Sequence, residues 1–425
     1  MKLNLKIIAL MNKIIIILII SSLLPFLVMA QKNLHKENIA ATYRPDDTSV
    51  HPIYKIYHDD DSSSLVFYEV DLSELSYRPS ADSTYHIAEA KIHYEVYMNY
   101  KAKLLIDSGS IHLQDYENYG KNNSNLGNFP IKIREGYSYV IEITLTDLNN
   151  NNSSINLLDI DKWDKLGRQN FYMKASDGLP MVYDYVERDQ SYWIIHRDTN
   201  IQYAWVKFFK PNLQPARPPM SGGMPNKRTI KSDSTFKIKF ENGISQEMRF
   251  TNQGYYHIFI DSTQQKGFSV FQFTTHFPYI SFPMQMIMPL RYLSSKTEFN
   301  QLISEKDKKK AVDDFWIKIA GNKERARRLI GLYYNRVQQA NMLFYSDREG
   351  WMTDRGMIFI VFGPPDKVFH DESMETWMYG YQKNNNSLKF NFYKTNNPFS
   401  NFDYLLDRTP AYSTPWNNSM EIWRR

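Results

Sequence analysis

The sequence predicts a mainly β protein with a C-terminal α+β module: two β-sandwich-like domains, then a domain of helices packed on an antiparallel sheet. Two observations predict this fold class. From about residue 62 to residue 289, short stretches alternate apolar and polar side chains between turn-forming clusters, which is typical of antiparallel strands. After residue 290, apolar residues recur every three or four positions and strand-like stretches follow, which indicates helices against a small sheet.

The first 30 residues have the pattern of an export signal. Three lysines are the only charged side chains before Gln31, and an apolar run ends in Val28-Met29-Ala30. A basic start, an apolar centre and small residues before the cut predict cleavage after Ala30 and a periplasmic, outer-membrane-associated protein. An uncleaved anchor is the alternative, because a membrane span needs roughly 17–25 residues. The break at Pro25 favours cleavage.

Composition excludes several classes of function. Removal of the three signal lysines from 51 basic residues leaves 48 against 46 acidic ones, so the net charge falls from +5 to +2. This balance gives no reason to expect nucleic acid or an anionic membrane surface as a partner. The chain has no cysteine, which excludes disulfides, a thiol nucleophile and a lipid-modified cysteine. No second apolar run of spanning length follows the signal, so we expect no integral span in the processed chain.

The two β regions follow a polar stretch. Residues 31–61 contain several acidic side chains, and we expect a flexible lead-in there. A β-sandwich-like domain is predicted over 62–160 and a second β-rich domain over 161–289, with a mobile Pro- and Gly-rich loop between Pro211 and Pro225. Strands are expected at 64–70, 90–98, 103–107, 137–145, 191–195, 201–209, 235–240, 254–260 and 268–273.

Residues 290–425 are predicted to form the α+β domain. Two shorter helices are expected at 299–303 and 308–319, and Asn322 can cap a longer amphipathic helix that continues to Phe344. Strands are expected at 357–362, 375–379 and 387–393.

One motif lies where that long helix ends. It reads Gly350-Trp351-Met352-Thr353-Asp354-Arg355-Gly356, and a later turn reads Gly363-Pro364-Pro365-Asp366. Together with the preceding helix and the later Glu375-Thr376-Trp377, this order resembles the GWxTD-domain family of exported, Bacteroidota-type bacterial proteins over roughly residues 290–425. The resemblance implies an envelope location and a fold. It adds little about biochemical role.

The motif residues have structural roles on chemical grounds alone. Gly350 and Gly356 can take a positive φ where the chain reverses from helix to strand. Trp351 offers a large apolar surface, and the side chains of Thr353 and Asp354 can accept hydrogen bonds from nearby backbone amides.

The remaining motif residues are a positively charged side chain and a turn that is expected to end a strand. Arg355 can pair with Asp354, Asp366 or Glu375. Gly363-Pro364-Pro365 is expected to end a strand, because proline lacks a donor and fixes φ. The functional alternative places Asp354, Arg355 and Asp366 in a pocket, with one Asp as general base and Arg355 as an anion clamp.

Other candidate sites are weaker. The ten histidines form no zinc-binding spacing, and neither a metal nor a cofactor is predicted. Trp193, Tyr203 and Trp205 lie on strands expected to be adjacent, where they would serve packing or glycan stacking. Three Asp-Ser-Thr triplets resemble a Bacteroidota O-glycosylation acceptor. Their serines are Ser83, Ser234 and Ser262.

We therefore predict a non-catalytic envelope protein that binds envelope or outer-membrane proteins in assembly or secretion. The alternatives are an envelope hydrolase with its site near the motif, and a glycan-binding protein.

Overall fold

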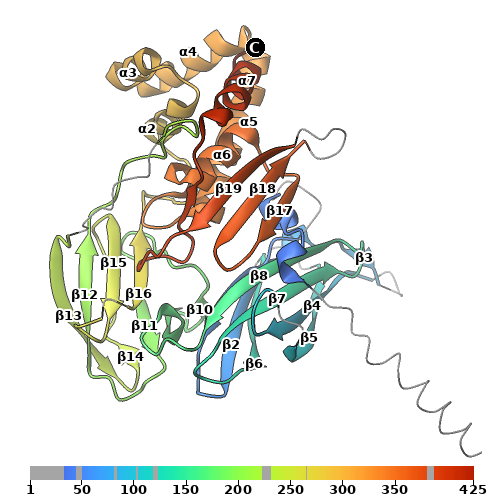
Figure 1. Ribbon diagram of the computed structural model, residues 1–425, viewed down its shortest axis with the longest axis vertical. Coiled ribbons are helices and arrows are strands. Elements are labelled where there is room, and N and C mark those ends of the chain that lie inside the picture. Colours follow the sequence, from blue (N-terminus) through green and yellow to red (C-terminus); the bar gives the residue numbers. More distant parts are fainter. Residues whose placement is uncertain are drawn as a thin grey trace, which may run out of the picture.

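The computed structural model describes residues 33–44, 50–80, 84–101, 104–117, 123–222, 231–264, 266–380 and 387–425. The predicted signal lies outside these residues. Three bodies follow one another along the chain: a blue-to-green sandwich, a green-to-yellow folded sheet and an orange-to-red unit of helices and sheet (Figure 1). Among the described residues, no helix combines the length and apolar character of a membrane span.

The first body is a sandwich of two antiparallel sheets. Apolar side chains from both sheets meet in one core, including Val66 and Phe129 from one sheet and Ile92 and Ile141 from the other. This arrangement follows from the alternation seen in sequence, because every second side chain of a strand points to the same face. One sheet contains β1 (Ile53–Tyr57), β2 (Ser63–Asp71) and β6 (Ser124–Lys132). The other contains β3 (Arg78–Pro79), β4 (His86–Tyr97), β5 (Leu105–Tyr116), β7 (Ser138–Asp147) and β8 (Ser153–Asp161).

The second body is one long antiparallel sheet folded over itself. Ile194 from its first half and Val206 and Ile258 from its second half share a core. Strand β13 belongs to both halves, because residues 234–239 pair with β12 and residues 240–241 pair with β14 across the Asn242–Gly243 turn, where both residues have positive φ. The strands are β9 (Phe171–Ala175), β10 (Pro180–Met181), β11 (Tyr192–His196), β12 (Tyr203–Phe209), β13 (Ser234–Glu241), β14 (Ile244–Ser245), β15 (Gly254–Phe259) and β16 (Phe268–Gln272), in the order β10-β9-β11-β14-β13-β12-β15-β16.

The third body packs helices on a four-stranded antiparallel sheet, as the fold class predicts. The long helix is capped as expected, because the side chain of Asn322 accepts a hydrogen bond from the Arg325 amide at 2.9 Å. The helices are α2 (Pro283–Ile287), α3 (Lys296–Ser304), α4 (Lys308–Ala320), α5 (Lys323–Phe344), α6 (Asp354–Phe362) and α7 (Ser413–Arg424). The strands are β17 (Lys367–His370), β18 (Met374–Tyr379), β19 (Leu388–Lys394) and β20 (Tyr404–Leu406), in sequence order.

The strand predicted at 357–362 is wrong, because these residues form α6. The side chain of Thr353 caps the helix, and Met357 to Val361 are all buried. The helix packs against α5, the sheet and α7, so apolar side chains are needed all round it. A short continuous apolar run has no periodicity that separates a buried helix from a buried strand.

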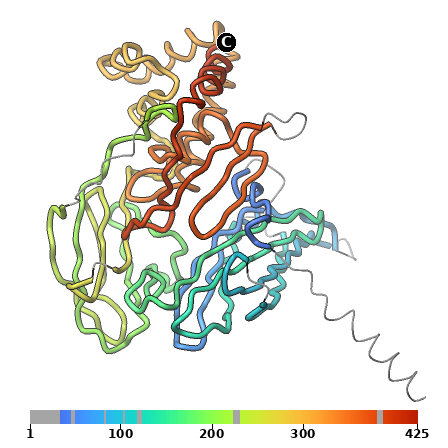
Figure 2. The backbone as a smooth tube through the Cα atoms, viewed as in Figure 1, coloured from blue at the N-terminus to red at the C-terminus, as the bar shows by residue number. Residues whose placement is uncertain are grey.

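The expectation of a flexible lead-in is also wrong where residues 33–44 and 50–61 are described. Leu34 and Tyr43 are buried, and the segment turns twice through η2 (Leu34–Lys36) and η3 (Ala40–Tyr43). It lies along β17 of the C-terminal sheet, where Ile39 donates to the Val368 carbonyl at 3.0 Å. Figure 2 shows this blue segment beside the orange C-terminal strands. Polar composition concealed the few apolar residues that anchor it.

Candidate functional site

The motif forms a tight connection between two helices. Residues Gly350–Met352 make the single turn η7 between α5 and α6, and Thr353 caps α6. The Thr353 hydroxyl accepts a hydrogen bond from the Gly356 amide at 3.0 Å and donates one to the Gly350 carbonyl at 2.8 Å. The expected helix-to-strand reversal is thus a helix-to-helix turn.

The two motif glycines are required by close packing. The positive φ expected for Gly350 and Gly356 is wrong, since neither has one. A Cβ on Gly350 would overlap the carbonyl oxygen of Ala340, and a Cβ on Gly356 would overlap that of Gly350. Glycine therefore allows α5, the turn and α6 to approach backbone to backbone.

Trp351 holds the turn at both its apolar and its polar atoms. The side chain is 3% exposed, and its indole N–H donates to Glu349 Oε2 at 2.8 Å. Its amide donates to the Asn341 side chain at 3.1 Å, while its carbonyl accepts from the Tyr292 hydroxyl at 2.9 Å. The residue connects α5, the turn and the segment before α3.

Asp354 is buried and fully engaged. Its Oδ2 accepts from the Leu406 amide at 2.8 Å and from Arg408 Nη1 at 2.8 Å, and Arg408 Nη2 contacts its Oδ1. The same guanidinium donates to the Arg217 carbonyl at 3.1 Å. Asp354 therefore joins the start of α6 to the C-terminal strand β20, and through Arg408 to the Pro-rich stretch of the second body.

Arg355 selects one of its three predicted partners. Its Nη1 donates to Glu375 Oε2 at 3.3 Å, and its Nη2 donates to the Phe402 carbonyl at 2.8 Å. The guanidinium lies over the ring of Tyr404 at 4.2 Å and over that of Phe344 at 5.0 Å. A buried arginine needs such a counter-ion and ring contacts, because an unpaired buried charge is costly.

Glu375 is the centre of this network. Its Oε1 accepts from the Trp377 indole at 2.5 Å, and its Oε2 accepts from the Tyr43 hydroxyl at 3.0 Å. His370 Nδ1 lies 3.4 Å from the same Oε2. Burial favours the neutral acid, but the charge of Arg355 and the hydrogen bonds outweigh it and lower the pKa of Glu375 to about 2.

Asp366 does not join this network. The residue is exposed, and its carboxylate contacts Arg44 at 3.5 Å and accepts from the Gly380 amide at 2.7 Å. Gly363, with φ of 86°, and the following Pro364-Pro365 end α6 instead of a strand. The three residues of the supposed pocket are therefore not brought together.

Sequence reasoning missed Tyr43, His370 and Arg408. Each lies far along the chain from its partner or outside the motif, so no local pattern marks it. The described residues contain no group of three or more His, Asp or Glu side chains that could hold a metal.

The glycan and modification candidates are dispersed. Tyr203 is exposed, while Trp193 and Trp205 are half-buried. The expected adjacency of their strands is wrong, because β14 and β13 lie between β11 and β12. Ser234 and Ser262 are exposed, at the start of β13 and in a turn after β15, and Ser83 lies outside the described residues.

Two surface clefts contain no motif residue. One, of about 640 Å³, lies between α3 and α7 and is lined by Glu298, Trp416 and Arg424 among others. The second, of about 470 Å³, lies where the three bodies meet and is lined by Asp159, Arg168 and Lys394 among others.

Comparison with known proteins identifies the C-terminal part. Residues 254–425 match the sequence model of the GWxTD domain. No curated protein matches the chain. Among solved structures, red sea bream transglutaminase is similar over 53% of this chain and 31% of its own, at 9% identity and a TM-score of 0.17. The chain thus spans about a third of that enzyme, and so low a score carries no argument.

The match begins at Gly254 and so includes β15 and β16 of the folded sheet, whereas the resemblance seen in sequence covered residues 290–425. Residues 254–425 of this chain therefore match a GWxTD domain.

Proposed function

We propose that this chain is a non-catalytic periplasmic protein of the cell envelope that binds other envelope proteins, in outer-membrane assembly or in secretion. The observation that carries the proposal is the engagement of the motif charges. Asp354 is bound by Arg408 and a backbone amide, and Arg355 is bound by Glu375. Charges held in buried internal pairs are costly to separate, so they are not available as a base or an anion clamp.

The surface that we propose for protein contact comprises the approach to α2 and the first turn of that helix. We define the α2 apolar segment as Tyr279, Phe282 and Met284, which are 57%, 51% and 41% exposed. Exposed aromatic and methionine side chains close together are enriched in protein interfaces, because they bury large area on association. Pro283 starts α2 and the Gln285 side chain accepts from the Phe282 amide at 2.9 Å, so the segment is held on an ordered turn.

The test is site-directed photo-crosslinking in living cells. A crosslinker at position 282 should capture a defined envelope protein, while one at Trp163, which is also exposed but lies between the β bodies, should not capture it. Phe282→Ser combined with Tyr279→Ser should abolish co-purification of that protein without changing the melting temperature. Equal capture from both positions would contradict the proposal.

The enzyme alternative has its own test. If the purified protein hydrolyses an envelope polymer and Arg408→Gln abolishes turnover while the fold persists, the motif network acts in catalysis. That result, with no partner recovered, would overturn the proposal.

A further inference from the structure

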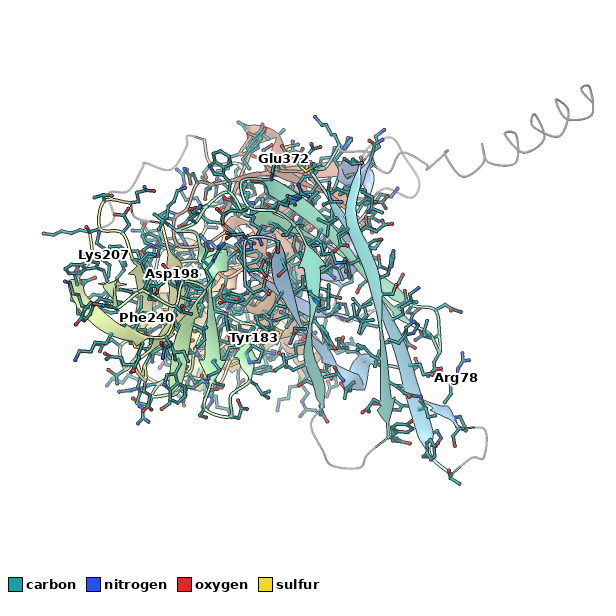
Figure 3. The ribbon with its side chains drawn as sticks, turned by 90° about the horizontal axis from the view of Figure 1, so that it is seen from below. Arg78, Tyr183, Asp198, Lys207, Phe240 and Glu372 are labelled. Carbon is teal, nitrogen blue, oxygen red and sulfur yellow. The ribbon has the colours of Figure 1, made fainter. Side chains whose placement is uncertain are left out.

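The cleft where the three bodies meet has features of a ligand site that the proposed function does not use. Its walls come from the first sandwich, the folded sheet and the third body. Its volume of about 470 Å³ falls in the range of small-molecule sites, and such sites favour domain junctions. Glu372, labelled in Figure 3 beside the strands of the first sandwich, is one of the residues that line the cleft.

Arg168 lies at the junction itself. It starts the turn η5 (Arg168–Asn170), between β8 of the first body and β9 of the second. One of its terminal nitrogens, Nη2, donates to the carbonyls of Pro398 at 3.2 Å and Asn397 at 3.5 Å in the third body. From the connection between the first two bodies, the side chain thus reaches the third body through neutral acceptors.

Within the part of the chain that the structure describes, Arg168 lacks a counter-ion of its own. Among the described residues no carboxylate oxygen lies within 4.0 Å of its guanidinium, and burial lowers the pKa of the group despite the charges of Asp184 and Asp164. Both carboxylates are already occupied, Asp184 by Lys55 at 2.5 Å and Asp164 by Lys266 at 3.1 Å.

The remaining charges and amides define what the cleft can accept. Lys394 is paired with Asp159 at 2.5 Å and Lys266 with Asp164 at 3.1 Å, so neither adds a free positive charge, and the exposed carboxylates of Asp161 and Glu372 also line the cleft. Asn396 and Asn401 line the cleft with exposed side chains. One half-buried guanidinium beside neutral amides fits one carboxylate next to hydroxyl groups, because an arginine fork binds a carboxylate with two parallel hydrogen bonds.

We propose that this cleft binds a small hydroxylated carboxylate, of the kind a uronic acid sugar presents, with Arg168 as the counter-ion of the carboxylate. Asn396 and Asn401 pair with its hydroxyl groups. Because Arg168 also contacts the Asn397–Pro398 loop, the bound ligand holds the three bodies together. The site is separate from the α2 apolar segment, so its test is independent of the proposed function.

The test is titration of the purified chain by calorimetry at low salt with three probes: D-glucuronate, D-glucose and acetate. Glucuronate should bind most tightly, because only it offers both the carboxylate and the hydroxyl groups. Loss of a charge-assisted pair should weaken binding by about tenfold or more, so Arg168→Gln should lose that factor. Arg168→Lys keeps the positive charge but lacks the planar guanidinium. Its affinity for glucuronate should therefore lie between that of the parent and that of Arg168→Gln.

Arg188→Gln is the matched control, because Arg188 is an exposed arginine of the same body and does not line the cleft. It should bind glucuronate like the parent. Circular dichroism melting of each variant separates loss of the ligand from loss of the fold, and Arg168→Lys keeps the test valid if Arg168→Gln does not fold. Three results would overturn the proposal: equal binding by Arg168→Lys and the parent, equal affinity for glucose and glucuronate, or no glucuronate binding up to about 10 mM.

Discussion

At the scale of the residue, the motif is defined by side chains that satisfy both an apolar and a polar requirement. Trp351 buries its ring and still donates through its indole N–H to Glu349. Arg355 is buried between two aromatic rings and still reaches Glu375. Each such residue would be costly to bury without its partner.

The first expectation concerns Trp351. Trp351→Ala should lower the free energy of unfolding by about 3–5 kcal/mol, because truncation of a buried tryptophan leaves a cavity. Denaturant unfolding measures this loss. Trp163→Ala, at a side chain that is 70% exposed, should change stability little. If Trp351→Ala has the same free energy of unfolding as the parent, the residue serves binding and does not stabilise the fold.

The second expectation concerns pH and Glu375. The pKa of Glu375 is lowered in the folded chain to about 2 from its ordinary value of 4.5, so the unfolded chain binds the proton more readily. The carboxylate therefore contributes stability above pH 4.5 and loses that contribution as the pH falls toward 2. Glu375→Gln should be less stable than the parent at pH 7, and the gap should narrow between pH 4.5 and pH 2.

Denaturant unfolding at stepped pH measures this gap. Glu421→Gln removes an exposed pair with Arg425 and should show almost no gap at any pH. A gap for Glu375→Gln that stays constant through the acid range would contradict the role given to this carboxylate.

At the scale of the element, the sequence predicted alternating strands and a helix cap, but it did not predict a helix that is buried on all sides. The strands at 90–98 and 137–145 show period-two patterns that match β4 and β7, and Asn322 marks the start of α5. The core-facing part of α6 is a continuous apolar run, so its sequence has no hydrophobic periodicity that indicates a helix. The helix is instead stabilised by packing against α5 and α7. The motif residues were recognised, whereas their geometry depended on that helix.

The third expectation compares two glycines of adjacent helices. Gly356→Ala should destabilise the chain by more than about 1–3 kcal/mol, because its Cβ would overlap the Gly350 carbonyl and force the backbone to move. Gly331→Ala in α5 meets nothing within 4 Å and should stabilise the helix by about 0.5–1 kcal/mol. Thermal melting of the two variants measures both effects: the melting temperature should fall for Gly356→Ala and rise for Gly331→Ala. Equal effects would show that helix propensity, and not close packing, determines the choice of glycine.

At the scale of the whole molecule, three bodies are joined by contacts between residues far apart in the chain. The change of pattern near residue 290 indicated helices after sheets, but nothing local indicated which surfaces meet. The hydrogen bond between Tyr43 and Glu375 spans 332 positions, and the Lys394–Asp159 contact spans 235. Such pairs leave no periodic signal, which is why residues 33–44 could not be placed from sequence.

The fourth expectation concerns that N-terminal segment. Deletion of residues 33–44 removes the Tyr43 ring, which lies 5.3 Å from that of Phe344 and 5.4 Å from that of Trp377. The shortened chain should expose this apolar surface, bind a hydrophobic dye and melt at a lower temperature. A synthetic peptide of residues 33–44, added in excess, should reverse both changes, and a scrambled peptide should not. Melting that is unchanged by the deletion would contradict a stabilising role.

The same N-terminal segment determines which step of folding can be completed last. A chain is synthesised from its N-terminus, so residues 33–44 are made long before β17 and Glu375. Until then the segment has no partner, and the two β bodies between them can already be folded. The final step of folding is the packing of residues 33–44 against the C-terminal sheet. A nascent or truncated chain that lacks the last quarter therefore exposes the apolar side chains of this segment, which chaperones can bind.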